Sequence, residues 1–204
     1  MKIEQLIKNL GGAANMVGGF CVAIAYSLHP HHQTPEVIAS QYWLNIHILF
    51  ALSLIFGIFG LIAVYQQHLK HSRLRGFIGF VLAVISLIGI FGLNFYEAFI
   101  NPVLANEAAD FVERYGAGTT IGYVTFLFPV FGGMFLPGYS LLCFDILHAE
   151  SISRRTVQLT LAGTVVFGIG LSGLLPMIVV QTGSVLFGCG LIGLGVVTIK
   201  KQEI

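Results

Sequence analysis

The chain has 204 residues, of which 56% are hydrophobic and only 9% are charged, and its formal net charge is +1 at pH 7. Soluble domains normally carry about a quarter charged residues, so this composition excludes a soluble globular domain. The small net charge also argues against a nucleic-acid partner, which requires a concentrated basic surface.

Six apolar stretches are each long enough to cross a bilayer, because about 20 helical residues span its roughly 30 Å hydrocarbon core. Pro129 and Pro137 lie inside the fourth stretch and predict a kink there. The sequence therefore predicts one all-α membrane domain over residues 1–204, a bundle of six transmembrane helices. Their expected positions are about 10–28, 42–65, 76–100, 120–146, 156–178 and 180–199.

The first stretch contains Ala23-Ile24-Ala25, the small-x-small form that a signal peptidase recognises. It is also rich in glycine, which suits close packing of helices better than the hydrophobic region of a signal peptide. We therefore expect the stretch to be retained as the first transmembrane helix.

The basic residues are concentrated at the termini and in every second loop. All of the ten lysines and arginines except Arg114 lie before the first span, after the last span, or in the loops that follow the second and fourth spans. The positive-inside rule therefore predicts that both termini are cytoplasmic, and we expect a multi-pass protein of a bacterial inner (plasma) membrane. The basic residues on this side are expected to contact anionic lipid head groups of the surrounding bilayer.

Two outer loops contain helix signals. Thr34-Pro35-Glu36 reads as an N-cap, a proline at the first helical position and an acidic first turn. A second, amphipathic helix is predicted in the loop 101–118, ended by glycine. It is expected over the outer mouth of the bundle, either as a plain interfacial helix or as a lid over a pocket.

Ionisable side chains inside hydrocarbon are costly, so those near the outer ends of spans two and three are candidate site residues. His47 and Glu97 are expected at similar depth, roughly 5–10 Å below the outer surface. Trp43 shares a helical face with His47, and Asn94 and Asn101 share one with Glu97. If the two faces meet, an imidazole and a carboxyl group lie opposite each other, with Trp43, Asn94 and Asn101 supporting them.

Three further histidines follow the first span: His29, His31 and His32. Imidazole and carboxylate form a suitable ligand set for zinc, copper or iron, and we favour His29, His47 and Glu97 over the other two histidines. Either His29 or His47 could instead be the axial ligand of a haem. The alternatives are a structural hydrogen-bonded pair of His47 and Glu97, or a polar pocket for a substrate or proton.

Other chemistry is weakly indicated. His68 and His148, on the inner side, are weaker candidates for a second site. Asp145 has no evident acid or base partner, and no HExxH, GxSxG or P-loop motif is present, so an enzyme is not favoured. Three isolated cysteines in the apolar spans are expected to be buried and to act as small hydrophobic residues. They are Cys21, Cys143 and Cys189.

The first half of the chain carries a pattern of separate short motifs. They are His29-Pro30, Trp43, His47, Gly57, Gly60, Tyr65-Gln66, Glu97-Ala98-Phe99 and Pro102-Val103-Leu104-Ala105. This pattern resembles a widespread group of small bacterial multi-span membrane proteins that has no assigned biochemical function. The resemblance implies a multi-span membrane fold and draws attention to His29, His47 and Glu97, but it implies no activity.

The leading functional hypothesis is an outward-facing His/Glu site that binds a transition metal, haem or a small ligand. A second is a small-molecule transporter or its membrane-embedded substrate-binding subunit, and six spans in about 200 residues match the size of such subunits in vitamin importers. A third is an assembly subunit that binds a membrane partner, or a second copy of itself, through glycine-rich faces. The last span offers such a face in Gly183, Gly188, Gly190, Gly193 and Gly195.

Overall fold

The computed structural model describes residues 3–115, 124–171 and 175–200, and these residues form helices and no strand. The fold is therefore all-α, as predicted. In chain order, the helices are α1 (Ile3–Ser27), α2 (Pro35–Ile38), α3 (Gln41–His68), α4 (Leu74–Phe95), α5 (Asn101–Glu107), α6 (Ala109–Tyr115), α7 (Val124–Ala149), α8 (Arg154–Gly170) and α9 (Met177–Lys200).

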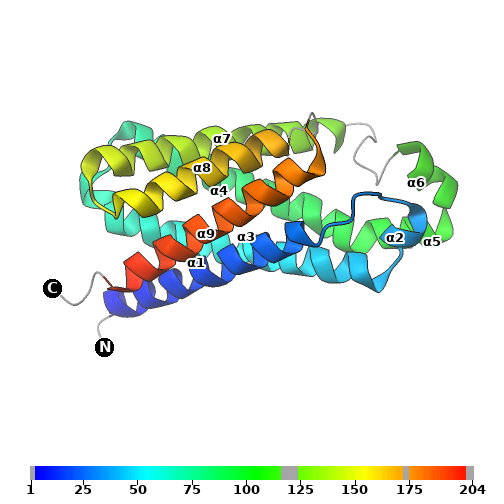
Figure 1. Ribbon diagram of the computed structural model, residues 1–204, viewed down its shortest axis with the longest axis horizontal. Helices are drawn as coiled ribbons and strands as arrows, with labels where there is room; N and C mark the ends of the chain where they lie inside the picture. Colours follow the sequence, from blue (N-terminus) through cyan, green and yellow to red (C-terminus); the bar gives the residue numbers. More distant parts are fainter. Residues whose placement is uncertain (1–2, 116–123, 172–174, 201–204) are drawn as a thin grey trace.

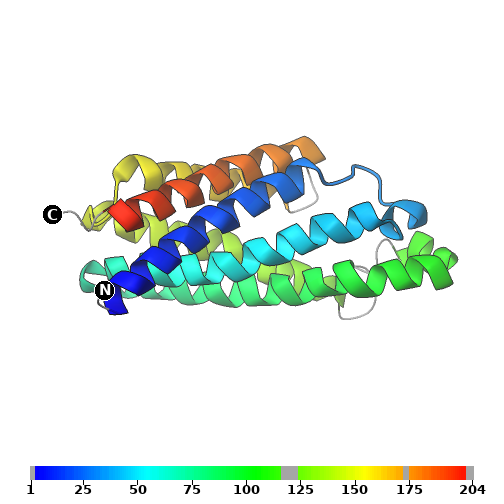
Figure 2. The ribbon, with the colours of Figure 1, turned by 90° about the horizontal axis from the view of Figure 1, so that it is seen from below.

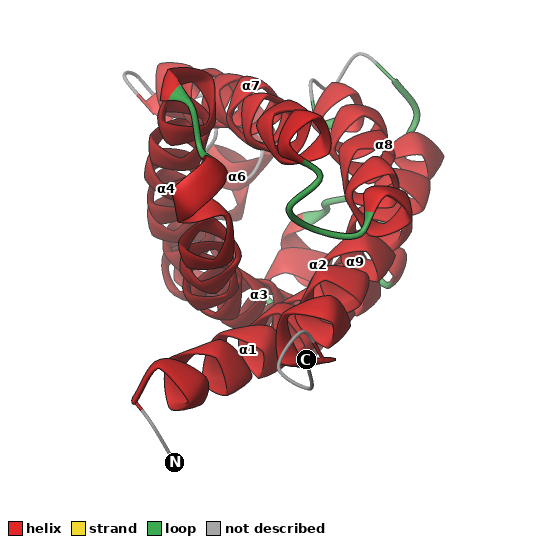
Figure 3. Ribbon diagram, turned by 90° about the vertical axis from the view of Figure 1, so that its left-hand side faces the viewer, coloured by secondary structure: helices red, strands yellow, loops and turns green. Residues whose placement is uncertain are grey.

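The long helices of the described part form a closed ring in which each packs against its neighbours in the chain. α1 contacts α3, α3 contacts α4, α4 contacts α7, α7 contacts α8 and α8 contacts α9. The ring closes because α9 packs along α1 (Figures 1 and 3). Both ends of the described chain therefore lie at the same end of the bundle, while α2, α5 and α6 lie at the opposite end (Figures 1 and 2).

Five helical segments of the described residues are long and apolar enough to cross a membrane: Gln5–Ser27, Gln41–His71, Leu74–Glu107, Phe126–Ala149 and Met177–Lys200. The fifth predicted span, 156–178, is wrong at its C-terminal end. Its helix, α8, ends at Gly170, and α9 already begins at Met177, directly after Pro176. Proline has no backbone N–H to donate inside a helix, but it is tolerated where a helix begins. The boundary between the two helices therefore falls at Pro176.

The third span was predicted to end near residue 100, and this is also wrong. A π-helical turn, Tyr96–Ile100, joins α4 to α5, so the helical path continues to Glu107. Pro102 lacks a backbone donor, and the wider π turn before it accommodates this loss without ending the helix. Glu97 therefore lies ten residues before the end of this segment, and not one turn from its end.

The amphipathic helix predicted in the loop 101–118 is divided into α5 and α6. Ala108 interrupts it with backbone angles outside the helical region (φ −147°, ψ 58°). Ala105 and Val112 pack with Ile38 of α2 and Trp43 of α3 in a small apolar cluster. The predicted terminating glycines, Gly116 and Gly118, lie outside the described residues. The helix at Thr34-Pro35-Glu36 is present but short, since α2 ends before Ser40 caps α3.

The glycines of α9 allow close packing against the neighbouring helices of the ring. A Cβ atom on Gly188 would lie 2.4 Å from the carbonyl oxygen of Gly19, and one on Gly195 would lie 2.4 Å from that of Gly12. Other glycines of α9 meet α8 at similarly short distances. Because α1 and α8 already occupy these surfaces, the glycine-rich face does not present the docking surface predicted for a partner.

The core along the ring axis is rich in aromatic side chains. Phe135 and Tyr139 of α7 pack against Phe187 of α9 and Phe167 of α8 with ring centroids about 5–6 Å apart. Tyr26 of α1 packs edge-on against Phe167 at 4.9 Å. These rings pack together in the middle of the bundle, and Tyr26 also lines the cavity described next.

Candidate functional site

The main cavity lies at the end of the bundle opposite the termini and has a volume of about 540 Å³. Every one of the long helices contributes to it, as does the segment between α8 and α9. Most of its wall is apolar, formed by residues such as Ile46, Phe50, Ile90, Leu93 and Val180. This volume and lining are typical of a small-molecule pocket, in which a few polar groups fix the orientation of the ligand.

Three of the predicted residues meet at the polar end of this cavity. Trp43 is 1% exposed, and its indole nitrogen donates a hydrogen bond of 2.8 Å to the backbone carbonyl of Glu97. The His47 imidazole packs against the Trp43 ring with centroids 4.2 Å apart, and its Nδ1 lies 2.9 Å from the carbonyl oxygen of Trp43. The helical faces of α3 and of the π turn after α4 therefore do meet, as the residue spacing indicated.

His29 joins this group from the segment after α1. Its ring centroid lies 5.6 Å from that of His47 and 5.4 Å from that of Trp43. Its Nδ1 is 3.1 Å from the carbonyl oxygen of Pro30. Burial lowers the pKa of the His29 imidazole, and the nearby His31 acts in the same direction. His29 is thus held neutral beside the cavity.

The two asparagines have different positions. Asn94 is 3% exposed and lines the cavity, and its amide nitrogen donates to the carbonyl of His47 at 2.9 Å. Asn101 is fully buried outside the lining and donates to the Glu97 carboxylate at 2.5 Å. Asn94 therefore fixes α3 against α4, and Asn101 fixes the Glu97 side chain.

The structure thus brings His29, Trp43, His47, Asn94 and Glu97 together around one cavity. The predicted alternatives His31 and His32 are exposed and do not line it. Among the described residues, no group of three or more His, Cys, Asp or Glu side chains is placed to hold a metal ion.

Sequence reasoning missed Tyr26, Phe50 and the α8–α9 residues that complete the wall. An aromatic or aliphatic residue in a transmembrane helix carries no signal that separates a cavity wall from core packing.

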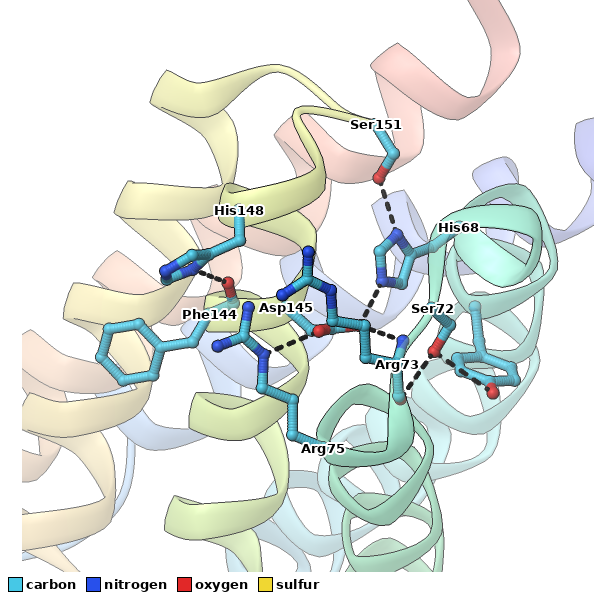
Figure 4. A network of polar contacts seen from close by, with 9 residues as sticks. His68, Ser72, Arg73, Arg75, Phe144, Asp145, His148 and Ser151 are labelled. Atoms are coloured by element: carbon cyan, nitrogen blue, oxygen red, sulfur yellow. Dashed lines mark hydrogen bonds and ion pairs between the residues drawn. The ribbon is translucent and has the colours of Figure 1, made fainter.

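At the opposite end of the bundle, Asp145 of α7 is the centre of a buried polar network (Figure 4). Its carboxylate accepts from the backbone nitrogen of Arg73 at 2.9 Å and from Nε of Arg75 at 2.7 Å. His68 lies 2.9 Å from the same carboxylate, and its other ring nitrogen lies 2.7 Å from the hydroxyl of Ser151. The expectation that Asp145 has no partner was wrong.

This network gives His68 a structural role. His68 is fully buried and Asp145 is 1% exposed, and together they connect the end of α3 to the start of α4 and the end of α7. His148 is exposed, and its Nδ1 lies 2.8 Å from the carbonyl oxygen of Phe144 on its own helix (Figure 4). The two inner histidines therefore lie in different environments and share no interaction that would form a second metal site.

All three cysteines are free thiols, and Cys21 and Cys143 are buried as expected. Cys189 of α9 is exposed on the outside of the helix, which corrects the prediction for that residue. Its neighbours in sequence pack against the two adjacent helices, Gly188 against α1 and Gly190 against α8, so Cys189 lies on the face of α9 between them.

We expect the stability of the protein to fall as the pH is lowered from about 7.5 to 5.5, in part because of His29. The ordinary imidazole pKa is about 6.5, and burial lowers it in the folded state. Between the two pKa values the unfolded chain binds a proton that the folded chain does not, so stability rises with pH in that window.

The measurement is the melting temperature at both pH values for the wild type and for His29→Gln. The variant is expected to lose less stability on acidification, whereas His32→Gln, which changes an exposed histidine, should behave like the wild type. If His29→Gln had the same pH dependence of stability as the wild type, His29 would not be a source of that dependence.

Comparison of the chain with family models, with curated proteins and with solved structures gave no match. The function of the cavity is therefore inferred from its geometry.

Proposed function

We propose that the chain is a membrane protein with six spans and two cytoplasmic termini, which binds a small organic ligand in the outward-facing cavity. α8 supplies the sixth span in addition to the five apolar segments. It has 17 residues, or about 26 Å of helix at 1.5 Å per residue, and it fills the ring between α7 and α9. The loops at the end that contains the termini carry most of the basic residues, which supports the orientation.

One observation carries the ligand-binding proposal: a cavity with apolar walls has a single polar end, where His29, His47, Asn94 and Glu97 converge. Packed protein interiors contain few voids larger than a water molecule. Buried ionisable groups in a membrane segment are costly, and a cluster of them beside an open volume is typical of a binding site. The alternative of a structural His47–Glu97 pair requires a bond between the two side chains, whereas Nδ1 of His47 lies beside the Trp43 carbonyl and the Glu97 carboxylate accepts from Asn101.

An organic ligand is favoured over a metal ion by the arrangement of the side chains. Two imidazoles flank the cavity, while the Glu97 carboxylate is engaged by Asn101. Among the described residues, no three His, Cys, Asp or Glu side chains are placed to hold one metal ion together. Structural zinc sites use four protein ligands and catalytic ones use three, so this set is incomplete.

The aromatic core favours binding over an open transport path. The rings of Tyr26 and Phe50 line the cavity and are in edge-to-face contact at 4.9 Å, and Tyr26 makes the same kind of contact with Phe167 at 4.9 Å. Phe135 and Phe187 continue this packing toward the other end. Transport would require this layer to separate, whereas binding requires no rearrangement of the fold.

We expect the protein, purified in lipid nanodiscs, to retain a small molecule that mass spectrometry of the extract detects. Val180→Phe should abolish this retention, because Val180 lines the cavity and the added ring occupies its volume. Val185→Phe is the matched control, since Val185 is on the same helix but 40% exposed on its outer surface.

Elemental analysis and the visible absorption spectrum of the same samples test for metal and haem. Equal retention by Val180→Phe and Val185→Phe, or a wild-type extract with nothing beyond the empty nanodisc, would contradict the proposal. Detection of stoichiometric metal or haem would mean that this group, and not an organic molecule, is the ligand of the cavity.

A further inference from the structure

We propose that the polar end of the cavity binds the positively charged end of its ligand, an organic ammonium group. This inference rests on the proposed function and specifies its ligand class. At that end the N–H donors are bonded to protein carbonyl groups, while several acceptors have no partner in the described residues.

Both histidines line the cavity, and each has one ring nitrogen that is free to accept a hydrogen bond. Nδ1 of His47 faces the Trp43 carbonyl oxygen, and Nδ1 of His29 faces the Pro30 carbonyl oxygen. A carbonyl oxygen only accepts hydrogen bonds, so each Nδ1 must carry the proton. In a neutral imidazole the other nitrogen, Nε2, is then an acceptor, and neither Nε2 has a hydrogen-bond partner among the described residues.

Asn94 fixes the framework of the site and does not itself face the ligand. Its amide nitrogen donates to the carbonyl of His47, which assigns the other terminal atom as Oδ1. This oxygen has no hydrogen-bond partner in the described part of the chain, and it is buried away from the cavity surface. The acceptors open to the ligand are therefore the two Nε2 atoms and the carboxyl group of Glu97.

Glu97 is the acidic side chain of the site, and an ammonium ligand would favour its ionised form. One of its carboxylate oxygens accepts from Asn101, which leaves the other oxygen open, and the residue lines the cavity. No lysine or arginine is among the described lining residues. A buried carboxylate is stabilised by an ion pair or hydrogen bonds, and an ammonium ligand would supply both.

The hydrogen-bond donors of the site are already bonded to backbone carbonyl groups and are not available to the ligand. The Trp43 indole N–H is used by the Glu97 carbonyl, and both Nδ1–H groups are used by backbone carbonyls. The Tyr26 hydroxyl and the exposed Gln33 amide can donate or accept and so do not oppose a donor ligand. The Trp43 and Tyr26 rings also offer the aromatic faces that attract an ammonium group.

Trp43 makes the test specific, because it is the only tryptophan of the chain and lies at the site. Its fluorescence is titrated in nanodiscs with three probes of matched shape: benzylammonium, benzyl alcohol and benzoate. Benzylammonium is expected to bind at least about 10-fold more tightly than the alcohol, and benzoate not to bind, because a second anion would face Glu97. Zinc chloride is titrated separately as a metal probe.

Glu97→Gln should reduce the preference for benzylammonium over benzyl alcohol by about 10-fold or more, because glutamine keeps an acceptor for Asn101 but removes the charge. Glu107→Gln is the control, since it removes an exposed carboxylate from α5 and should leave the preference unchanged. Melting curves of both variants verify that they fold.

The outcomes separate the ligand class from the proposed function. Binding of benzyl alcohol or benzoate as tightly as benzylammonium would overturn the ammonium class and leave the cavity as a binding site. Saturable zinc binding without benzylammonium binding would also overturn it, in favour of a metal. If no probe changes Trp43 emission, the class and the proposed organic-ligand function both fail.

Discussion

Replacing Asp145 with asparagine is expected to lower the free energy of unfolding by about 3 kcal/mol. The carboxylate accepts from the Arg73 backbone and the Arg75 side chain and contacts His68, so one side chain holds α3, α4 and α7 together. Asparagine has a single acceptor oxygen and no charge. His68 is fully buried and cannot turn to water, so it would lose a partner without a substitute.

The measurement is thermal or denaturant unfolding in nanodiscs or mild detergent, with Asp110→Asn as the matched control. Asp110 is exposed on α6, so its replacement should change stability by less than about 0.5 kcal/mol. A second variant, Gly76→Ala, tests the same site from the other side, because a Cβ there would lie 2.2 Å from the Asp145 carboxylate. Wild-type stability in both Asp145→Asn and Gly76→Ala would show that the network contributes little to the fold.

The outer site was accessible from the sequence because helical periodicity determines which residues share a face. Trp43 and His47 are four residues apart, and Asn94 and Glu97 are three apart, so each pair had to lie on one side of its helix. Rare polar residues in apolar helices then marked the faces that meet. What the sequence did not show is the cavity, which depends on how the apolar residues of all the long helices pack.

The inner network was not predicted because its partners are distant in sequence. Asp145 is separated from Arg75 by 70 residues and from His68 by 77, and only the ring order of the helices brings them together. Basic residues near a membrane surface are adequately explained by topology and lipid contacts, so Arg75 carried no separate signal. The continuation of α4 through the π turn was missed because Asn101-Pro102 is typical of a helix start and proline is disfavoured inside a helix.

The glycines were interpreted as a surface for other proteins because a glycine-rich face has the same sequence pattern whichever helix it packs against. In this fold the first and last spans are neighbours, and that closure uses the glycine faces of α1 and α9 against each other. Sequence spacing does not reveal that α1 and α9 are adjacent. A homo-oligomer or a partner would have to use the outer surfaces of the ring.

Among these glycine contacts, the one between α8 and α9 is expected to be the most destabilised by alanine substitution. A Cβ on Gly163 would lie 2.3 Å from the backbone nitrogen of Phe187, and one on Gly183 would lie 2.4 Å from that of Phe167. Backbone atoms cannot turn aside as a side chain can, so alanine at either position must force the helices apart. Each substitution should therefore cost about 2–3 kcal/mol, at the upper end of the effects of overpacking.

The double variant Gly163→Ala/Gly183→Ala should cost clearly less than the sum of the two single variants. Both substitutions push the same pair of helices apart, so the second meets an interface that the first has already opened. Gly92→Ala is the matched control, because a Cβ there meets no atom within 4 Å, and alanine in an open helical position is expected to be neutral or slightly stabilising. Unfolding of the four proteins under one set of conditions gives the coupling energy. Additive costs would mean that the two glycines relieve separate contacts and that α8 and α9 do not move as one interface.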